Sequence, residues 1–211
     1  MEAKTVLVLA PHTDDAELGC GGTIARFVEE GRKVFVAAFS TAEESLPKGM
    51  PPDTLKREFF EAMPMLGVPT EQLIVFDFPV RRLSYHRQEV LENIVMLRRT
   101  IKPELVLIPS GNDLHQDHQT VYNEGLRAFK DMSIMGYELP WNHIHFSAQV
   151  FFVLQLQHLE RKWAALQCYH SQMVLDRLYL KREFIEGIAR VRGVQVKAEW
   201  AEAFEVLRLK W

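Results

Sequence analysis

The fold of this chain is decided near its start by the stretch Val6-Leu-Val-Leu-Ala-Pro-His-Thr-Asp-Asp-Ala-Glu-Leu-Gly-Cys-Gly-Gly22. Its first five residues are all apolar, which is typical of a strand buried on both faces, and a proline ends the run. His12, Asp14 and Asp15 follow at once. A strand that stops at ionisable groups places them at the carboxyl end of a sheet, where open α/β proteins bind their ligands.

Strands and helices alternate along the chain. Apolar runs predict further strands over 34–39, 73–76 and 105–109, and helical periodicity with Gly or Pro stop signals predicts helices over 24–30, 55–66 and 90–101. This alternation favours a mostly parallel sheet covered on both faces. We therefore expect a Rossmann-like three-layer α/β/α fold, with residues 1–211 forming a single domain.

The second half of the chain gives weaker signals. Its patterns predict helices over 121–129, 159–169 and 176–192, a strand over 149–154 and a final edge strand over 200–209. Residues 131–146 show little periodicity and suggest a loop over the carboxyl edge, where a sugar could stack on Tyr137 or Trp141. A surface or subunit-contact loop, and with it a homo-oligomer, is an equally good interpretation of this segment.

Composition limits the classes of partner. Hydrophobic residues make up 47% of the chain and charged residues 25%, with a formal net charge of -3, so neither nucleic acid nor an acidic membrane is expected as a partner. No apolar run approaches the roughly 18 residues of a membrane span. The two cysteines fit a reducing compartment, and Met1 to Thr5 lack the features of a signal peptide. We expect a cytoplasmic protein.

A second polar cluster repeats the first. The run 105–109 ends at a proline, and Asp113, His115, Asp117 and His118 follow within a few residues. Parallel strand ends meet at one edge of a sheet, so both clusters are expected to converge. Four carboxylates gathered there would repel one another unless a cation compensates them. A metal site is the economical interpretation, although a lone His is more often structural and an Asp after a strand often caps a helix.

The glycines after Asp15 admit another interpretation. Gly19-Cys-Gly-Gly22 follows a strand, as a dinucleotide-binding turn does, but the G-x-G-x-x-G spacing is absent. A nicotinamide or flavin oxidoreductase is therefore disfavoured. Small residues at these positions would also let the following helix pack close to the sheet.

Two motifs resemble those of a known family. Pro11-His-Thr-Asp-Asp15 with Gly19-Cys-Gly-Gly-Thr23, and Asp113-Leu-His-Gln-Asp-His118, are similar to the paired motifs of the PIG-L/LmbE-like zinc-dependent N-deacetylases. Stretches common in bacterial members also match, namely Tyr137-Glu-Leu-Pro-Trp141, Tyr169-His-Ser-Gln172 and Ala201-Glu-Ala-Phe-Glu205. The resemblance thus extends over nearly the whole chain.

The resemblance implies roles for particular residues. His12, Asp15 and His118 would bind Zn²⁺, although the same ligands also suit Fe²⁺. Asp14 would be the general base, and His115 would stabilise the tetrahedral intermediate or protonate the leaving amine. Asp117 would orient a histidine.

Other positions carry less information. Arg82 aligns with a family arginine and would contact substrate, with a surface ion pair as the alternative, while Trp141 would bind the sugar. The chain departs from the family at Ala16, usually an acid, and at Thr13, usually a proline. Neither departure affects an expected ligand or the base.

These observations predict a zinc-dependent hydrolase that removes an acetyl group from the nitrogen of an N-acetylated sugar or sugar conjugate. The enzyme class follows from the two polar clusters, because amide hydrolysis needs activated water, a base and a group that stabilises the oxyanion. The substrate class follows from the resemblance alone. A hydrolase of another acyl amide and a non-catalytic carbohydrate-binding protein of the same fold are the alternatives.

Overall fold

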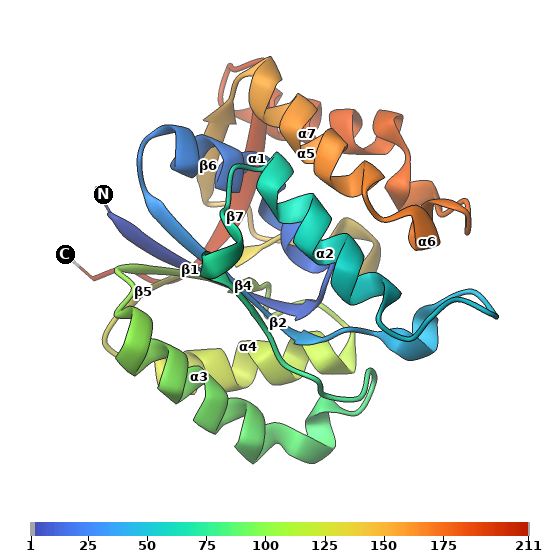
Figure 1. Ribbon diagram of the computed structural model, residues 1–211. Helices are drawn as coiled ribbons and strands as arrows, with labels where there is room; N and C mark the ends of the chain where they lie inside the picture. Colours follow the sequence, from blue (N-terminus) through green and yellow to red (C-terminus); the bar gives the residue numbers. More distant parts are fainter. Residues whose placement is uncertain (1–2, 211) are drawn as a thin grey trace.

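A seven-stranded sheet lies between two layers of helices in the computed structural model, which describes residues 3–210 (Figure 1). The strands are β1 (Thr5–His12), β2 (Lys33–Ser40), β3 (Leu73–Val75), β4 (Leu105–Pro109), β5 (Ser133–Tyr137), β6 (Val150–Leu154) and β7 (Trp200–Arg208). Their order is β3-β2-β1-β4-β5-β7-β6, with β1 to β5 parallel and β7 antiparallel to both neighbours. The expected three-layer, mostly parallel α/β fold is confirmed. The expectation about the start of the chain falls partly on Met1 and Glu2, outside the described residues.

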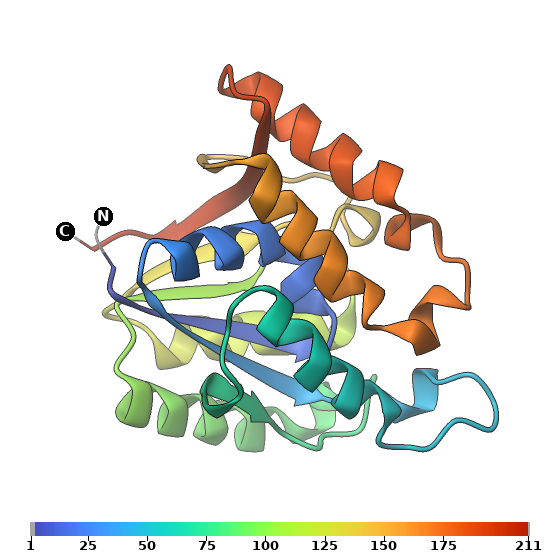
Figure 2. The same cartoon turned by 45° about the horizontal axis from the view of Figure 1, so that its top comes forward.

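The helices divide between the two faces of the sheet, as Figures 1 and 2 show. One face is covered by α1 (Asp15–Glu29), α2 (Thr54–Met65), α5 (Leu156–Gln167) and α7 (Arg182–Gln195), with the short α6 (His170–Met173) beyond α5. The other face is covered by α3 (Arg87–Ile101) and α4 (Gln116–Ala128). No helix within residues 3–210 has the length and apolar composition that crossing a membrane requires.

The central strand β1 supplies both cores, which explains its unbroken apolar run. Val6, Val8 and Ala10 pack beneath the layer of α1, α2 and α5, while Leu7 and Leu9 pack against α3 and α4. All five side chains are fully buried. Alternate residues of a strand point to opposite faces, so a strand covered on both sides must be apolar throughout.

Two expectations about strands are wrong. Residues 131–146 are not all loop, because they contain β5, an interior strand paired with β4. The last strand, β7, is not at the edge but lies between β5 and β6. Its alternation resembles that of an edge strand because Glu202 and Glu205 occur among apolar residues, yet both glutamates are buried and hydrogen-bonded inside the protein.

Helix boundaries also differ from expectation, and α4 begins at Gln116 rather than 121. The first helix begins at Asp15 rather than near residue 24, so the glycines lie inside it. The last helix begins at Arg182 rather than 176, because Asp176 adopts a left-handed backbone conformation, with φ of 52°, that a helix cannot contain. Residues 177–181 therefore form a separate segment between α6 and α7.

Helix α1 is broken at Cys20, whose φ of -148° is not helical. A Cβ atom on Gly19 would lie 2.3 Å from the Tyr137 ring, so the small residue does allow close packing on the sheet. The carboxylate of Glu202 in β7 accepts hydrogen bonds from the amides of Gly22 and Thr23 beyond the break. It also pairs with the buried Lys162 of α5 at 2.7 Å.

This buried ion pair predicts a large effect of replacing Lys162. Lys162→Met should lower the free energy of unfolding by about 3–5 kcal/mol, because it leaves the Glu202 carboxylate buried without its cation. Urea denaturation of the variant and the wild type measures the change. Lys130→Met, an exposed lysine changed in the same way, is the control. Equal stability of the two variants would contradict a structural role for the pair.

Candidate metal centre

The two polar clusters meet because their strands are neighbours. Strands β1 and β4 pair in parallel through Val6 to Val8 and Leu105 to Leu107, so both end at the same edge of the sheet. This is also where the strand order reverses, since β2 lies on one side of β1 and β4 on the other. In open α/β sheets this switch point is the usual ligand site.

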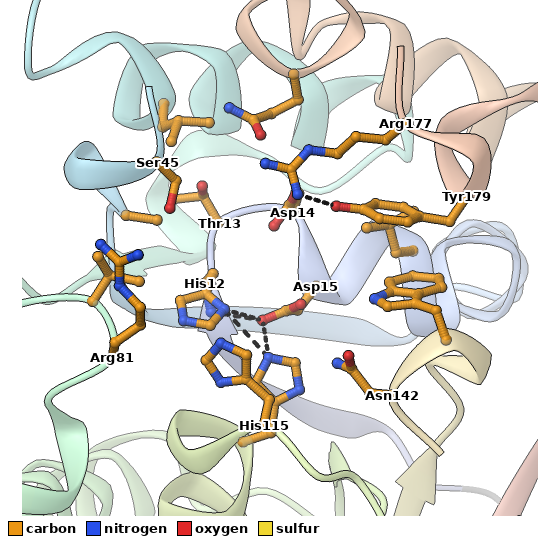
Figure 3. Close-up of a pocket in the computed structure, with 17 residues that line it drawn as sticks. His12, Thr13, Asp14, Asp15, Ser45, Arg81, His115, Asn142, Arg177 and Tyr179 are labelled. Carbon is orange, nitrogen blue, oxygen red and sulfur yellow. Dashed lines mark hydrogen bonds and ion pairs between the residues drawn. The ribbon is translucent and has the colours of Figure 1, made fainter. Parts of the chain in front are cut away.

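Three donor atoms face one another at the centre of this edge. His12 Nδ1 lies 3.3 Å from His118 Nε2, and Asp15 Oδ2 lies 3.0 Å from the first and 3.2 Å from the second (Figure 3). His12 is the last residue of β1, Asp15 begins α1, and His118 lies in the first turn of α4. All three residues are buried.

The outer nitrogens of both histidines are held by buried aspartates. His12 Nε2 lies 3.0 Å from Asp117 Oδ2, and His118 Nδ1 lies 2.7 Å from Asp113 Oδ2. A carboxylate is a pure acceptor, so each outer nitrogen carries the proton in the neutral ring. The unprotonated nitrogens are then His12 Nδ1 and His118 Nε2, the two that face the centre.

The charges around this centre stabilise a cation. Burial alone would lower the pKa of His12, but Asp15 and Asp117 raise it to about 10. Burial acts on His118 in the same way, and its pKa is nevertheless raised to about 9, by Asp15 and Asp113. Despite its burial, Asp15 has its pKa lowered by both histidines.

The donor set fits a divalent metal ion. Ligand atoms bound tetrahedrally at about 2.0–2.1 Å are about 3.3–3.4 Å apart, close to the separations of 3.0, 3.2 and 3.3 Å among these three atoms. Carboxylates that hold the outer nitrogens of metal-binding histidines are usual in such sites. His115 lies beside them, and one ring nitrogen from each of His12, His115 and His118 falls within a 4.8 Å group that could hold a metal ion.

A cavity of about 380 Å³ opens over the centre. Asp14 lines it, and burial, followed by the charge of Asp15, raises the pKa of Asp14 to about 6. Asp14 precedes α1, yet in the described part of the chain its side chain makes no capping hydrogen bond. The simple helix-cap interpretation of Asp14 is therefore not supported.

The backbone around Asp14 is held by a buried tyrosine, Tyr169. The hydroxyl of Tyr169 lies 2.5 Å from the Thr13 carbonyl oxygen and 2.6 Å from Glu17 Oε1. All three residues are fully buried. Ala16 is buried in the apolar core, so the acid that supports this loop is at position 17.

The other sequence-predicted residues lie at different depths. The carboxylate of Asp117 accepts hydrogen bonds from the backbone amides of Arg81 and Leu83 and also contacts His12.

Trp141 lines the cavity, and one face of its ring stacks on Tyr179 with the ring centroids 4.2 Å apart. Tyr137 does not reach the cavity, since it is fully buried and its hydroxyl donates to the Leu9 carbonyl oxygen. Arg82 is exposed and outside this cavity, and its neighbour Arg81 lines the wall instead.

Several cavity residues were not among the predicted site residues, including Arg81, Asn142, Gln172, Arg177 and Tyr179. Arg177 falls within the helix predicted over 176–192, whereas it precedes α7 and reaches into the cavity (Figure 3). The stretch Tyr169 to Gln172 carried a signal through the family resemblance. No periodicity marks Arg177 or Tyr179.

Comparisons with known proteins agree with this geometry. Residues 7–129 match the sequence model of the PIG-L family, described as GlcNAc-PI de-N-acetylase. The chain is 30% identical over 175 residues to the uncharacterized deacetylase YaiS of Escherichia coli K12, covering 80% of this chain and 91% of that protein. It is 24% identical to the 4-oxalmesaconate hydratase of Pseudomonas putida over 92% of this chain and 81% of that enzyme.

A solved structure with the same fold is that of the N,N'-diacetylchitobiose deacetylase from Pyrococcus horikoshii. It superposes with a TM-score of 0.81 at 18% identity, covering 98% of this chain and 84% of that chain. The likeness at this identity concerns the fold. The family match covers more than half of the chain, so this protein belongs to the PIG-L family and is an enzyme of that hydrolytic family.

The outer aspartates predict a measurable effect on metal affinity. Asp113→Asn should weaken binding of Zn²⁺ by about 10- to 100-fold, because the carboxylate that orients His118 is lost. Competition with a chromophoric chelator measures the affinity. Asp53→Asn, an exposed aspartate changed in the same way, should bind Zn²⁺ as the wild type does. Unchanged affinity in Asp113→Asn would exclude the orienting role.

Proposed function

We propose that this protein is a zinc-dependent N-deacetylase that releases acetate from an N-acetylated sugar or sugar conjugate, with the whole chain acting as one catalytic domain. The observation that carries this proposal is the triangle of His12, Asp15 and His118 beneath a cavity that also contains Asp14. The family match to a de-N-acetylase of a glucosamine conjugate supports the sugar as substrate.

In this proposal His12, Asp15 and His118 hold the metal ion. Bound there, a divalent metal lowers the pKa of water and polarises a carbonyl group. The aspartates behind the two histidines keep both rings in the required orientation. Zn²⁺ is the proposed ion because two imidazoles and one carboxylate are a common catalytic zinc set.

Asp14 is the proposed general base. It lines the cavity and makes no capping bond in the described chain, so its carboxylate is available to accept a proton from water. Burial and the neighbouring Asp15 raise its pKa to about 6, which brings the base closer to neutral pH. It can later return that proton to the leaving amine.

His115 is proposed to donate a hydrogen bond to the developing oxyanion. Its Nδ1 accepts the Asp117 amide at 3.2 Å, so the proton of the neutral ring is on Nε2. Burial, followed by the charges of His118 and His12, lowers the pKa of His115 to about 4. In this proposal the ring therefore acts as a neutral hydrogen-bond donor.

A substrate panel tests the proposed activity. Acetate release from N-acetylglucosamine and its conjugates supports the sugar substrate, whereas release only from aliphatic N-acetyl amides would assign another acyl amide. Binding of sugars without turnover in zinc-loaded protein would favour the carbohydrate-binding alternative. Parallel assays with Zn²⁺ and Fe²⁺ identify the metal.

Addition of water to a carbon–carbon double bond is a second candidate reaction. The similarity to a hydratase over 92% of this chain favours it, and the same centre could activate water for it. An unsaturated dicarboxylate belongs in the panel for this reason. Loss of its ultraviolet absorbance without acetate release from any amide would replace the deacetylase proposal.

The separate roles of base and ligand predict different variant phenotypes. Asp14→Asn should retain about one Zn²⁺ per chain and lose about 100- to 10,000-fold in kcat, because only the proton acceptor is removed. His118→Ala should lose the metal itself. Metal analysis and acetate assays on both variants, with Asp53→Asn as control, measure these effects. Full activity in Asp14→Asn or full metal content in His118→Ala would contradict the assigned role.

A further inference from the structure

Arg177 adds a positive charge to the cavity, and this charge acts on the proposed base by lowering the pKa of Asp14. Its side chain lines the cavity, and Figure 3 shows it reaching over Asp14 from the wall opposite Arg81. It comes from the segment 177–181 between α6 and α7, which the left-handed turn at Asp176 separates from α6. The base and the metal ligands come from different elements.

The Arg177 guanidinium lacks a carboxylate partner. Within residues 3–210 no carboxylate oxygen lies within 4.0 Å of it, while Arg81, the other arginine of the cavity, pairs with Glu44 at 2.8 Å. The adjacent Asp176 pairs with Lys181 instead. Of the five N–H donors of an arginine, one has a hydrogen-bond partner in the described part of the chain, where Nη1 donates to the Tyr179 hydroxyl at 2.6 Å.

The neighbours of Arg177 fix its position. Tyr179 accepts that hydrogen bond, and its ring stacks on Trp141 with centroids 4.2 Å apart and planes 12° from parallel. Trp141 in turn packs near Phe184 of α7. A guanidinium held in this way keeps its remaining donors oriented, which suits bidentate binding of a carboxylate or phosphate.

We propose that Arg177, held by Tyr179 and Trp141, binds an anionic group of the substrate, so that the preferred N-acetylated substrate carries a carboxylate or phosphate. This inference rests on the proposed deacetylase function and adds the charge of the substrate to it. The anion neutralises the guanidinium and places the acyl amide over Asp14 and the metal ligands. Arg177 is thus a specificity-determining residue.

Matched substrates test the proposal. N-acetylglucosamine is the neutral member, N-acetylmuramic acid adds a carboxylate, and N-acetylglucosamine 6-phosphate adds a phosphate. The wild type should hydrolyse at least one anionic member with a kcat/KM about tenfold or more above that of the neutral sugar, and the better of the two identifies the anion.

Variants at Arg177 separate this role from others. Arg177→Met should lower kcat/KM for the preferred anionic sugar about tenfold to a hundredfold more than it lowers kcat/KM for the neutral sugar. Arg177→Lys keeps the positive charge but lacks the planar guanidinium that binds an anion through two hydrogen bonds. Its kcat/KM for the anionic sugar should lie between those of the wild type and Arg177→Met. Arg99→Met, an exposed arginine of α3, is the control. Equal losses on neutral and anionic sugars would overturn the proposal, because Arg177 would then act on the reacting centre.

A binding measurement keeps this inference separate from the proposed activity. Calorimetric titration of metal-free wild type and Arg177→Met with N-acetylglucosamine 6-phosphate and N-acetylmuramic acid requires no turnover. Weaker binding of an anionic sugar by Arg177→Met supports the subsite even if no acetate is released, in which case the deacetylase proposal alone fails. Equal affinities in both proteins, or a wild type that hydrolyses the neutral sugar as well as the anionic ones, would overturn the subsite.

Discussion

The orientation of two imidazole rings is the constraint on which the centre depends. His12 Nδ1 and His118 Nε2 face each other because Asp117 and Asp113 hold the opposite sides of the rings. Those aspartates are fixed in turn by backbone amides, of Arg81 and Leu83 for the first and of His115 for the second. Arg81 adopts a left-handed conformation, with φ of 64°, in the turn that brings its amide to Asp117. The segment after β3 and the start of α4 therefore supply the backbone amides that hold the two aspartates, and through them the two rings, in place.

The division of the chain between chemistry and selectivity follows from the topology. The matched family region ends at residue 129 and contains the expected ligands, the base and His115. The wall formed by Trp141, Gln172, Arg177 and Tyr179 comes entirely from later residues. Substitutions in this later wall can change which substrate fits while the triangle of donor atoms and its aspartates stay the same.

The sequence was sufficient for the features that depend on local pattern and on strand order. The apolar run before His12 and the run before Asp113 predicted parallel strands whose ends converge, and the two clusters do lie together. It was insufficient where tertiary packing decides. Glu202 and Glu205 resemble the polar face of an edge strand until Lys162 and Ser110 are seen beside them. Arg177 resembles one more basic residue of the helix predicted over 176–192, whereas the left-handed turn at Asp176 and the extended Lys181 place it before α7.

The break in α1 has a consequence for the order in which the chain can fold. The amides that follow Cys20 hydrogen-bond to Glu202, about 180 residues further along the chain. While the protein is being synthesised from its N-terminus, these amides have no partner until β7 has emerged and inserted between β5 and β6. The segment that follows Asp14 and Asp15 is thus made well before the strand whose glutamate binds its amides. A contact so distant in sequence slows folding and makes it depend on the presence of β7.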